Sequence, residues 1–524
     1  MEEFLPQLLA FPPNPLPPRG LSNGEIDRQL IAQIQLISQI NESKLIEGIT
    51  GDADLLDVLD PSTNTIPFLC TLLARIRHVQ NSKKAAPETT ASFAPGNFLW
   101  EKAVEFINHF DPVQVRYVGH DLRRLIETFT RVADITSNVR PFAGNLVAEA
   151  DCIQPLLVIP IVRTVILRVD PSSSCFTSTH TVFIRLCLRA KAYTEALDVL
   201  DKDILHFPTN GEKMYNLPLL CGHHETSATY ITSTSQLSAD LNYRDHLLYF
   251  LYGGMIYIGL KNWERALLFL EIVVMSPTEN TASMIQVEAY KKSVLTSLIA
   301  TGKPPTLPRT TNTQASKHYH AIARPYDAVA EMFVAGKADK FRAEVEAGQE
   351  IWHNDCNTGI LFEVAFAFQK FQILNLGKTF IALSVADVIR HTSSPSTVPE
   401  MEQYVHSLIT SGLLNASLVP ASGPQSSSVL RFSTSSRTGP LSRSELQQFE
   451  ELKQQTIKTT ELANHIKAAD KLFELSAPYL EWARKMKKAA KNGELDGGFT
   501  GMIPTPMGDD IYAIDDPEDM LAEM

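Results

Sequence analysis

The sequence predicts a mainly α-helical protein: a right-handed solenoid of TPR-like helical repeats, then a winged-helix subdomain, then a long C-terminal helix. Three observations predict it. A helical hairpin at residues 249–270 has a counterpart 70 residues upstream, which indicates a repeat. Two short helices and two β-prone segments between residues 384 and 432 follow the order of a winged helix. A capping box at Ser442 begins a helix with recurring apolar positions.

Composition excludes several classes of protein. A chain of 524 residues with 44% hydrophobic residues can hold several domains. The net charge of −12 argues against a general binder of nucleic acid or anionic membranes, because phosphates are held by clustered Lys and Arg. No apolar run reaches the roughly 18 residues of a membrane span. With Glu2, Glu3 and scattered prolines, the N-terminus is not expected to be a signal peptide.

The N-terminal half is expected to hold a proline-rich, weakly ordered arm over residues 1–24 and helical repeats over residues 25–245. Residues 140–169 are apolar and predicted to be helical with proline breaks, whereas the Ser- and Thr-rich residues 209–237 predict an insertion or irregular connection. Two apolar faces are predicted: Ile31, Ile34, Ile37 and Ile40 on one helix, and Leu122, Leu125, Ile126 and Phe129 on another.

The hairpin at residues 249–270 carries the clearest pattern. Gly259 marks the end of its first helix, and Gly253 and Gly254 inside that helix each cost about 1 kcal/mol relative to alanine. We expect such glycines where another helix backbone comes close; the alternative is a loop at the pair. The predicted faces are Tyr249, Tyr252, Ile256 and Tyr257 on the first helix, and Trp263, Ala266, Leu267 and Leu270 on the second.

The same pattern occurs upstream. Tyr193, Ala196 and Leu197 precede Trp263, Ala266 and Leu267 by 70 residues, which equals two units of about 35 and is close to the tetratricopeptide period. The proline-rich stretch 302–308 interrupts the array. Helices are predicted to resume from Tyr326, with the apolar run 361–376 buried.

Residues 373–433 are interpreted as the winged helix, after a helical part at residues 246–372. Ser384 and Asp387 begin one helix, and Gly412 ends the next. The β-prone segments 415–419 and 428–432 follow. We expect their edges to pair with a neighbouring strand, with interface residues Leu413, Leu414, Leu418, Val429 and Phe432.

A linker at residues 434–441 leads to the C-terminal helix, predicted over residues 442–490. Its apolar positions recur at heptad-like spacing and exceed what the helix can bury alone. Pro478 is expected to kink or end it, and the acidic residues 491–524 are expected to be disordered. The residues expected to contact partner helices are Leu446, Phe449, Leu452, Leu462, Ile466 and Leu472.

Helical repeats that lead into a winged helix and then a solitary amphipathic helix resemble the layout of the PCI-domain family, with residues 246–433 as the PCI domain. Residues 252–267, 288–292 and 377–384 are similar to the signature of the COP9 signalosome subunit 3 family within it. The resemblance covers about residues 177–418. The N-terminal block matches only in its helical character.

The resemblance implies a non-catalytic scaffold subunit of the COP9 signalosome in the cytoplasm and nucleus. Its partners would be the other PCI and MPN subunits, joined through winged helices and a bundle of C-terminal helices. That complex deneddylates cullins and so regulates cullin-RING ubiquitin ligases, with the chemistry in another subunit. The alternative is a PCI subunit of the proteasome lid or of the translation initiation factor 3 complex.

Candidate catalytic and metal-binding residues are few, and we expect neither a cofactor nor a metal. His318 and His320 have the spacing of a metalloprotease pair, but the next aspartate, Asp327, is too near. The cluster at Cys221, His223 and His224 lacks a second group of ligands. All six cysteines are widely spaced without a C-x-x-C pair, which is typical of a reduced cytosolic or nuclear protein with buried thiols.

Nucleic-acid binding is the main alternative for a winged helix. Its second helix, residues 400–412, contains two glutamates and no Lys or Arg, so phosphate repulsion opposes DNA binding. A basic cluster near the C-terminal end of the last helix could contact an acidic partner, although such clusters are more often solvated and favour the helix dipole. It consists of Arg484, Lys485, Lys487, Lys488 and Lys491.

Overall fold

The chain forms two compact units, Met1–Leu441 and Ser442–Met524, and the predicted repeats and predicted winged helix share the first. The computed structural model describes residues 5–9, 11, 22–46, 54–82, 93–133, 150–208, 219–224, 226–278, 282–308, 311–393, 396–420, 428–433, 444–474 and 477–491. Most of the predicted arm, part of the predicted insertion, the linker 434–441 and nearly all of the predicted tail lie outside the described residues.

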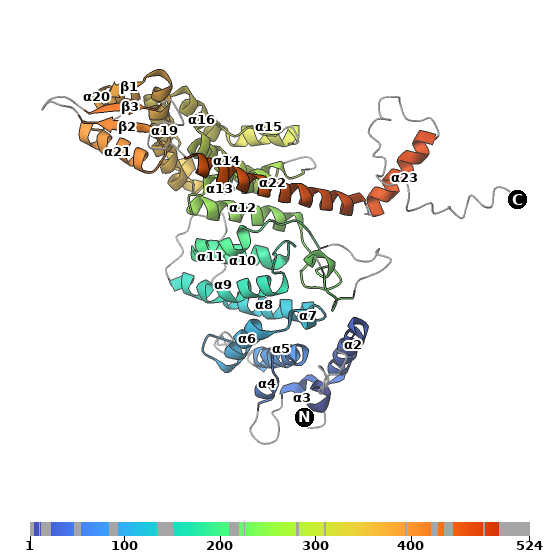
Figure 1. Ribbon diagram of the computed structural model, residues 1–524. Coiled ribbons are helices and arrows are strands. Elements are labelled where there is room, and N and C mark those ends of the chain that lie inside the picture. Colours follow the sequence, from blue (N-terminus) through green and yellow to red (C-terminus); the bar gives the residue numbers. More distant parts are fainter. Residues whose placement is uncertain are drawn as a thin grey trace. The chain divides into compact units, whose positions relative to one another are not determined.

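The first half of unit 1 is a stack of helices that pack on elements close to them in the chain, most of them around α5 and α9 (Figure 1). Their apolar faces share one large core. The helices are α1 (Leu5–Leu8), α2 (Asn23–Gln39), α3 (Glu42–Ile46), α4 (Leu55–Val58), α5 (Thr65–Ser82), α6 (Phe98–His109), α7 (Pro112–Val115), α8 (Gly119–Ala133), α9 (Ala150–Val169), α10 (Ser178–Ala190) and α11 (Tyr193–Leu200).

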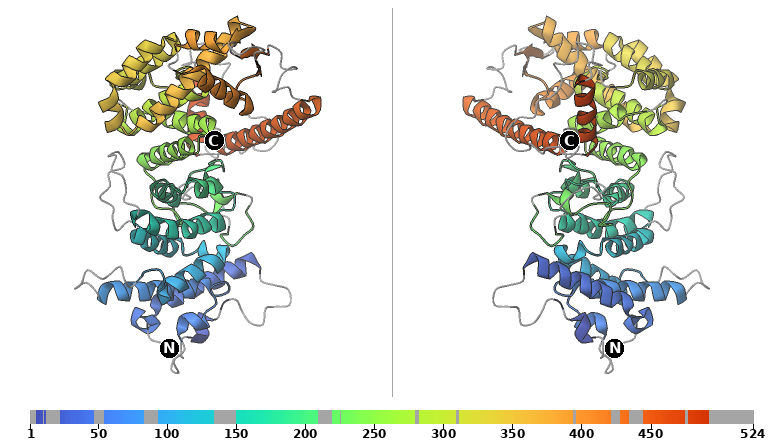
Figure 2. Two further views of the ribbon diagram at one scale, coloured as in Figure 1. Left: turned by 90° about the vertical axis from the view of Figure 1, so that its left-hand side faces the viewer. Right: turned by 90° about the vertical axis from the view of Figure 1, so that its right-hand side faces the viewer.

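The stack continues with helices that share a second core. Figure 2 shows the ribbon from two further sides. This layered arrangement is the expected helical-repeat solenoid. The elements are the 3₁₀ helix η3 (Ser227–Thr229), α12 (Tyr243–Gly259), α13 (Trp263–Met275), α14 (Met284–Thr301), α15 (Thr313–Ile322), α16 (Arg324–Ala335), α17 (Ala338–Ala347), α18 (Gln349–Asn354) and α19 (Thr358–Thr379).

The predicted hairpin is confirmed as α12 and α13. Helix α12 runs through Gly253 and Gly254 without a break and ends at Gly259. The repeat is also visible in the backbone, because Lys191 and Lys261, which are 70 residues apart, both adopt a left-handed conformation in the tight turn between paired helices. The tyrosine face of α12 is buried as expected.

Gly253 is required because a side chain of the next helix comes close. A Cβ atom added there would lie 2.7 Å from the ring of Phe269, and one added at Gly254 would lie 3.0 Å from Leu270. The tightest contacts therefore come from side chains, and the backbone of α13 also comes close at Gly254, where an added Cβ would lie 3.6 Å from the Ala266 carbonyl oxygen. The Gly253→Ala variant should lose about 1–3 kcal/mol of unfolding free energy through overpacking.

Gly359 provides the control for that prediction, because it lies in helix α19 with nothing within 4 Å of an added Cβ. Gly359→Ala should stabilise the chain by roughly 0.4–1 kcal/mol, since alanine lowers the entropy of the unfolded state. Denaturant unfolding of both variants measures the two effects. Equal responses at the two positions would refute the packing explanation for Gly253.

The predicted stripe on α2 is wrong in part. Ile37 and Ile40 are buried, but Ile31 is 42% exposed. A spacing of three residues turns by about 300°, so the isoleucines drift around the helix instead of sharing a face. The buried side follows Leu30, Gln33 and Ile37, and the Gln33 side chain donates a hydrogen bond to the Leu8 carbonyl (3.0 Å).

The predicted proline breaks in residues 140–169 are also wrong for the described part. Helix α9 continues through Pro155 and Pro160. An interior proline costs about 3 kcal/mol, and burial of this helix between α8 and α10 offsets that loss. The buried side chains include Val158, Ile159, Val162, Val165 and Ile166.

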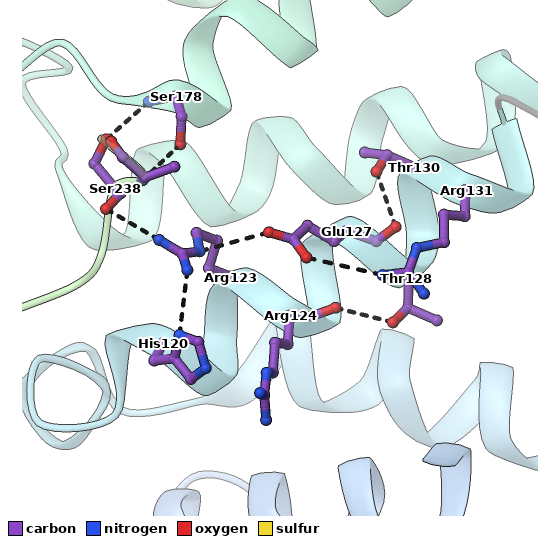
Figure 3. Close-up of polar contacts among 10 residues, drawn as sticks. His120, Arg123, Arg124, Glu127, Thr128, Thr130, Arg131, Ser178 and Ser238 are labelled. Carbon is purple, nitrogen blue, oxygen red and sulfur yellow. Dashed lines mark hydrogen bonds and ion pairs between the residues drawn. The ribbon is translucent and has the colours of Figure 1, made fainter. Parts of the chain in front are cut away.

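The predicted irregular connection, where it is described, is packed against the solenoid rather than extended from it. Arg123 of α8 reaches the Ser238 carbonyl (3.3 Å), and Ser178 at the start of α10 exchanges hydrogen bonds with Ser238 and Ala239 (3.0 Å each) (Figure 3). An added Cβ at Gly119 would lie 2.3 Å from the Ser235 carbonyl oxygen. Ser235 within the predicted connection 209–237, and Ser238 and Ala239 directly after it, therefore tie α8 to α10.

Unit 1 ends in a small subdomain with its own core. It contains the expected order of helix, helix, strand, strand: α20 (Val385–Thr392), α21 (Val398–Thr410), β2 (Ala416–Val419) and β3 (Val429–Phe432). An additional strand, β1 (Ala382–Ser384), completes an antiparallel sheet of order β1-β3-β2. Helix α19 runs without a break across residue 373, the predicted boundary between the helical part and the winged helix. Its residues up to Phe368 belong to the second core, whereas Ile373 belongs to the core of the small subdomain.

Unit 2 consists of two described helices, α22 (Glu445–Glu474) and α23 (Ala477–Lys491). Pro478 lies in the first turn of α23, where a backbone N–H would have no acceptor within the helix and proline is tolerated. The prediction that the C-terminal helix is interrupted at Pro478 is therefore confirmed. Within the described parts of the chain, no helix combines the length and apolar character that crossing a membrane requires.

Candidate interaction surfaces

Helix α22 exposes a series of large apolar side chains. Within unit 2 they lack cover, which agrees with the expectation that this helix cannot bury its apolar surface alone. The side chain of the predicted contact Leu472 lies outside the described residues. The exposed fractions are 80% for Leu446, 66% for Phe449, 62% for Leu452, 49% for Ile457, 60% for Leu462, 52% for Ile466 and 62% for Phe473.

The expected heptad repeat is not regular along α22. Leu446, Phe449 and Leu452 are centred about 120° around the helix from Leu462 and Ile466, at 100° per residue. A strict heptad would keep them on one seam. The apolar surface therefore turns along the helix, which suits several partner helices better than a single one.

The predicted interface residues of the sheet subdomain fall into two groups. Leu414 and Phe432 are buried in its core, so they are not available to a partner while the subdomain is folded. Leu413 is 51% exposed and Val429 is 38% exposed, while Leu418 is half-buried. Of the five, Leu413, Val429 and part of Leu418 remain candidates for contact.

The expectation that residues 429–432 pair with a neighbouring strand is wrong. Strand β3 is the central strand, with β1 on one side and β2 on the other. Its backbone groups are therefore used within the sheet, whereas the outer edge of β2 is not paired in the described sheet. The Ser433 N–H donates a hydrogen bond to the Asn415 carbonyl (2.9 Å), so the backbone groups of Asn415 point toward β3. In an antiparallel pair this direction alternates from residue to residue, so the backbone groups of Ser417 also point toward β3. The N–H of Leu418 therefore points to the outer edge of β2.

Two phenylalanines on α19 form an exposed apolar pair that sequence reasoning missed. Phe362 and Phe366 are 66% and 62% exposed, although the run 361–376 was expected to be buried. They lie one helical turn apart, opposite the buried Leu361, Val364 and Phe368. A run that is apolar all round gives no sequence signal for which side is covered.

The histidine and cysteine candidates have local structural roles. His320 Nδ1 lies 2.8 Å from Asp327 and 3.1 Å from the Tyr290 hydroxyl, joining α14, α15 and α16. Cys221 Sγ donates to the Asn23 carbonyl (3.0 Å), and His224 contacts the Leu219 carbonyl. Among the described residues, no three His, Cys, Asp or Glu side chains are grouped to hold a metal ion.

The buried thiols are unsuited to nucleophilic chemistry. Burial raises the pKa of Cys70, Cys175 and Cys187 to about 12, so they remain protonated. Burial also lowers the pKa of His180 to about 4, which leaves this core histidine neutral at physiological pH. These groups behave as core residues.

The glutamates of α21 have structural partners. Glu400 accepts a hydrogen bond from the Thr397 N–H (2.8 Å) in a capping box, and this bond lowers the pKa of Glu400. Glu402 accepts a hydrogen bond from the N–H of Ser428 (3.1 Å), the residue before β3, and this bond links the start of the strand to α21. Both carboxylates would face a phosphate backbone with negative charge if α21 entered a DNA groove.

Comparison with known proteins supplies independent information. A family model described as COP9 signalosome complex subunit 3, N-terminal helical repeats, matches residues 31–314, more than half of the chain. A protein called COP9 signalosome complex subunit 3 from Emericella nidulans is 33% identical over 498 residues, which cover 95% of this chain and 96% of the relative. Proteins with the same name are 27% identical in Neurospora crassa and 28% identical in Drosophila melanogaster, covering 80% and 70% of this chain and 79% and 73% of the relatives.

Proposed function

Because the chain belongs to the COP9 signalosome subunit 3 family, we propose that it is a non-catalytic scaffold subunit of the COP9 signalosome. Its partners would be the other PCI and MPN subunits of that complex. The assembly deneddylates cullins and so regulates cullin-RING ubiquitin ligases. We also propose that the protein is located in the cytoplasm and nucleus. Imaging of a fluorescently tagged chain would test this localisation.

The exposed apolar surface of α22 is the observation that carries the structural part of this proposal. Burying one Leu or Phe side chain contributes about 1.5–3 kcal/mol, so a helix that exposes Leu446, Phe449, Leu452 and Ile466 gains strongly from a partner bundle. The turning of that surface suits a helix with neighbours on more than one side. We infer that α22 enters the bundle of C-terminal helices.

Affinity purification of the tagged chain tests the assignment. We expect mass spectrometry to identify sister PCI and MPN subunits and neddylated cullins at lower abundance. Recovery of proteasome base subunits or ribosomes would instead support the proteasome-lid or initiation-factor alternative. The named relatives do not favour that alternative, because all three are signalosome subunits.

Within this role, we propose that the sheet subdomain of residues 373–433 works as a winged helix. The β2 edge, rather than β3, would add a strand from a neighbouring PCI subunit. The outward N–H of Leu418 would supply a hydrogen bond to that strand, and the exposed Leu413 and Val419 would flank it. The glutamates of α21 support a protein partner over nucleic acid.

The Leu418→Pro variant tests this edge. Proline removes the outward N–H without removing a hydrogen bond between β2 and β3, so recovery of the neighbouring subunit should fall several-fold. Leu418→Ala is the matched control: it loses the same side chain and keeps the N–H. If both variants retain the neighbour equally in co-purification, strand pairing at β2 is excluded.

A further inference from the structure

Helix α23 has an apolar side and a cationic side. Tyr479, Trp482 and Met486 recur at helical spacing, and the Trp482 ring remains 45% exposed. The rings of Phe473, Tyr479 and Trp482 lie 5.1 Å and 5.6 Å apart in succession, so an aromatic row continues from the end of α22 onto α23.

The side of α23 next to this row is positively charged, because Lys485 lies one turn from Trp482 and Lys488 one turn further along. Arg484, Lys485 and Lys488 are exposed, and the helix contains a single acidic residue, Glu481. Cations near a helix C-terminus favour the helix dipole, and that effect accounts for a solvated basic end. It does not account for an exposed tryptophan beside the cations. The combination is typical of a surface that binds an acidic, partly apolar segment.

The chain itself supplies a segment of that chemistry. Residues 492–524 contain no Lys or Arg, and within them residues 509–516 read Asp-Asp-Ile-Tyr-Ala-Ile-Asp-Asp. Two pairs of carboxylates therefore flank the apolar Ile511, Tyr512 and Ile514. The charge is opposite to that of α23, and the apolar centre matches its aromatic row.

Chain length allows the two segments to meet. Residues 492–508 place 17 positions between the two segments, and a chain of that length can reach at most roughly 55–60 Å. The 15 residues of α23 extend over about 22 Å. A tether that can span this distance raises the effective concentration of one segment at the other, so even a weak contact would be populated.

We propose that residues 509–516 bind the aromatic and cationic surface of α23 in the same molecule. The carboxylates pair with Lys485 and Lys488, and Ile511 and Ile514 cover the row around Trp482. An acidic partner must then displace this segment before it reaches α23. The contact needs no signalosome subunit, so its failure would leave the proposed scaffold role unaffected.

Carbodiimide cross-linking of the isolated full chain tests the contact, because it joins a lysine amine directly to a nearby carboxylate. We expect cross-links from Lys485 and Lys488 to residues 509–516 within one molecule, shown by mixing ¹⁴N- and ¹⁵N-labelled protein. Ile511→Ser with Ile514→Ser keeps every carboxylate and should lower the yield at least threefold. Ile503→Ser with Met507→Ser, outside the segment, should leave it unchanged.

Unchanged yield in the Ile511 and Ile514 variant would overturn the proposal, because tethering alone would then explain the cross-links. Cross-links mainly between differently labelled molecules would replace it with pairing of two copies. Hydrogen exchange gives a second measurement: neutralising Asp509, Asp510, Asp515 and Asp516 to Asn should speed amide exchange in α23 several-fold. Neutralising Glu494 and Asp496 should not, and equal exchange in wild type and the four-residue variant would also refute the contact.

Discussion

The double variant Leu452→Asp and Ile466→Asp is expected to be lost from the signalosome while its solenoid stays folded. Both side chains are exposed in the isolated chain, at 62% and 52%. A carboxylate placed in an apolar bundle must be desolvated without a partner, which costs several kcal/mol per group. Because the side chains contact solvent in unit 2, substitution should change the stability of the free chain by less than about 0.5 kcal/mol.

Co-sedimentation with the sister subunits measures this effect, and circular dichroism follows the fold. The variant Gln454→Asp with Asn464→Asp provides the control, since it adds the same charge at exposed polar positions of α22. The control should co-sediment like the wild type. Full incorporation of the Leu452 and Ile466 variant would contradict the bundle role of α22.

Lys292→Met is expected to destabilise the second core strongly. The Lys292 ammonium is almost fully buried, 2.7 Å from Glu288 and 2.6 Å from the Asn357 side-chain oxygen. Breaking a buried ion pair by removing one partner costs up to about 3–5 kcal/mol, and here it also takes the charged donor from the Asn357 side-chain oxygen. Glu288 would lose its nearer partner and keep only Lys291, 4.0 Å away on the same helix.

This ion pair belongs to a network that joins four elements. Asn357 donates to the Tyr326 hydroxyl (2.8 Å), which donates to Asp355 (2.8 Å), and Lys291 lies 2.7 Å from the same carboxylate. The network therefore links α14, α16, the end of α18 and the start of α19. Loss of one member should loosen all four.

Native-state hydrogen exchange in urea measures the unfolding free energy of these helices individually. Lys340→Met, at an exposed position of α17, is the control and should change this free energy by less than about 0.5 kcal/mol. Replacing Glu288 by Leu together with Lys292→Met should recover part of the loss, because both charges then leave the core. Similar losses for Lys292→Met and Lys340→Met would refute the importance of the network.

Local patterns predicted the elements reliably. The spacing of tyrosines in α12, the turn before Trp263, and the capping of α20 by Ser384 depend on residues within one or two turns of each other. The strands β2 and β3 were likewise visible as short β-prone segments. Strand β1 was missed because three residues after a long helix give too little alternation to recognise.

The family and the chemical character of the surfaces were also accessible from the sequence. The apolar residues of α22 exceed what one helix can bury, and they are exposed in the structure. The arrangement of these residues around the helix was not predicted. The three-residue intervals between Leu446, Phe449 and Leu452 resemble a continuous seam, but at 100° per residue they turn away from Leu462 and Ile466 along the helix.

By itself, the sequence determined which segments are helices or strands and which family the chain belongs to, because periodicity, capping and motif identity are properties of neighbouring residues. Only the tertiary structure decided that β3 is central, that α9 tolerates Pro155 and Pro160, and that Phe362 and Phe366 face outward. Each of these depends on which distant segment packs alongside. Burial against such a segment contributes as much free energy as a local preference costs, so the packing partner determines the outcome.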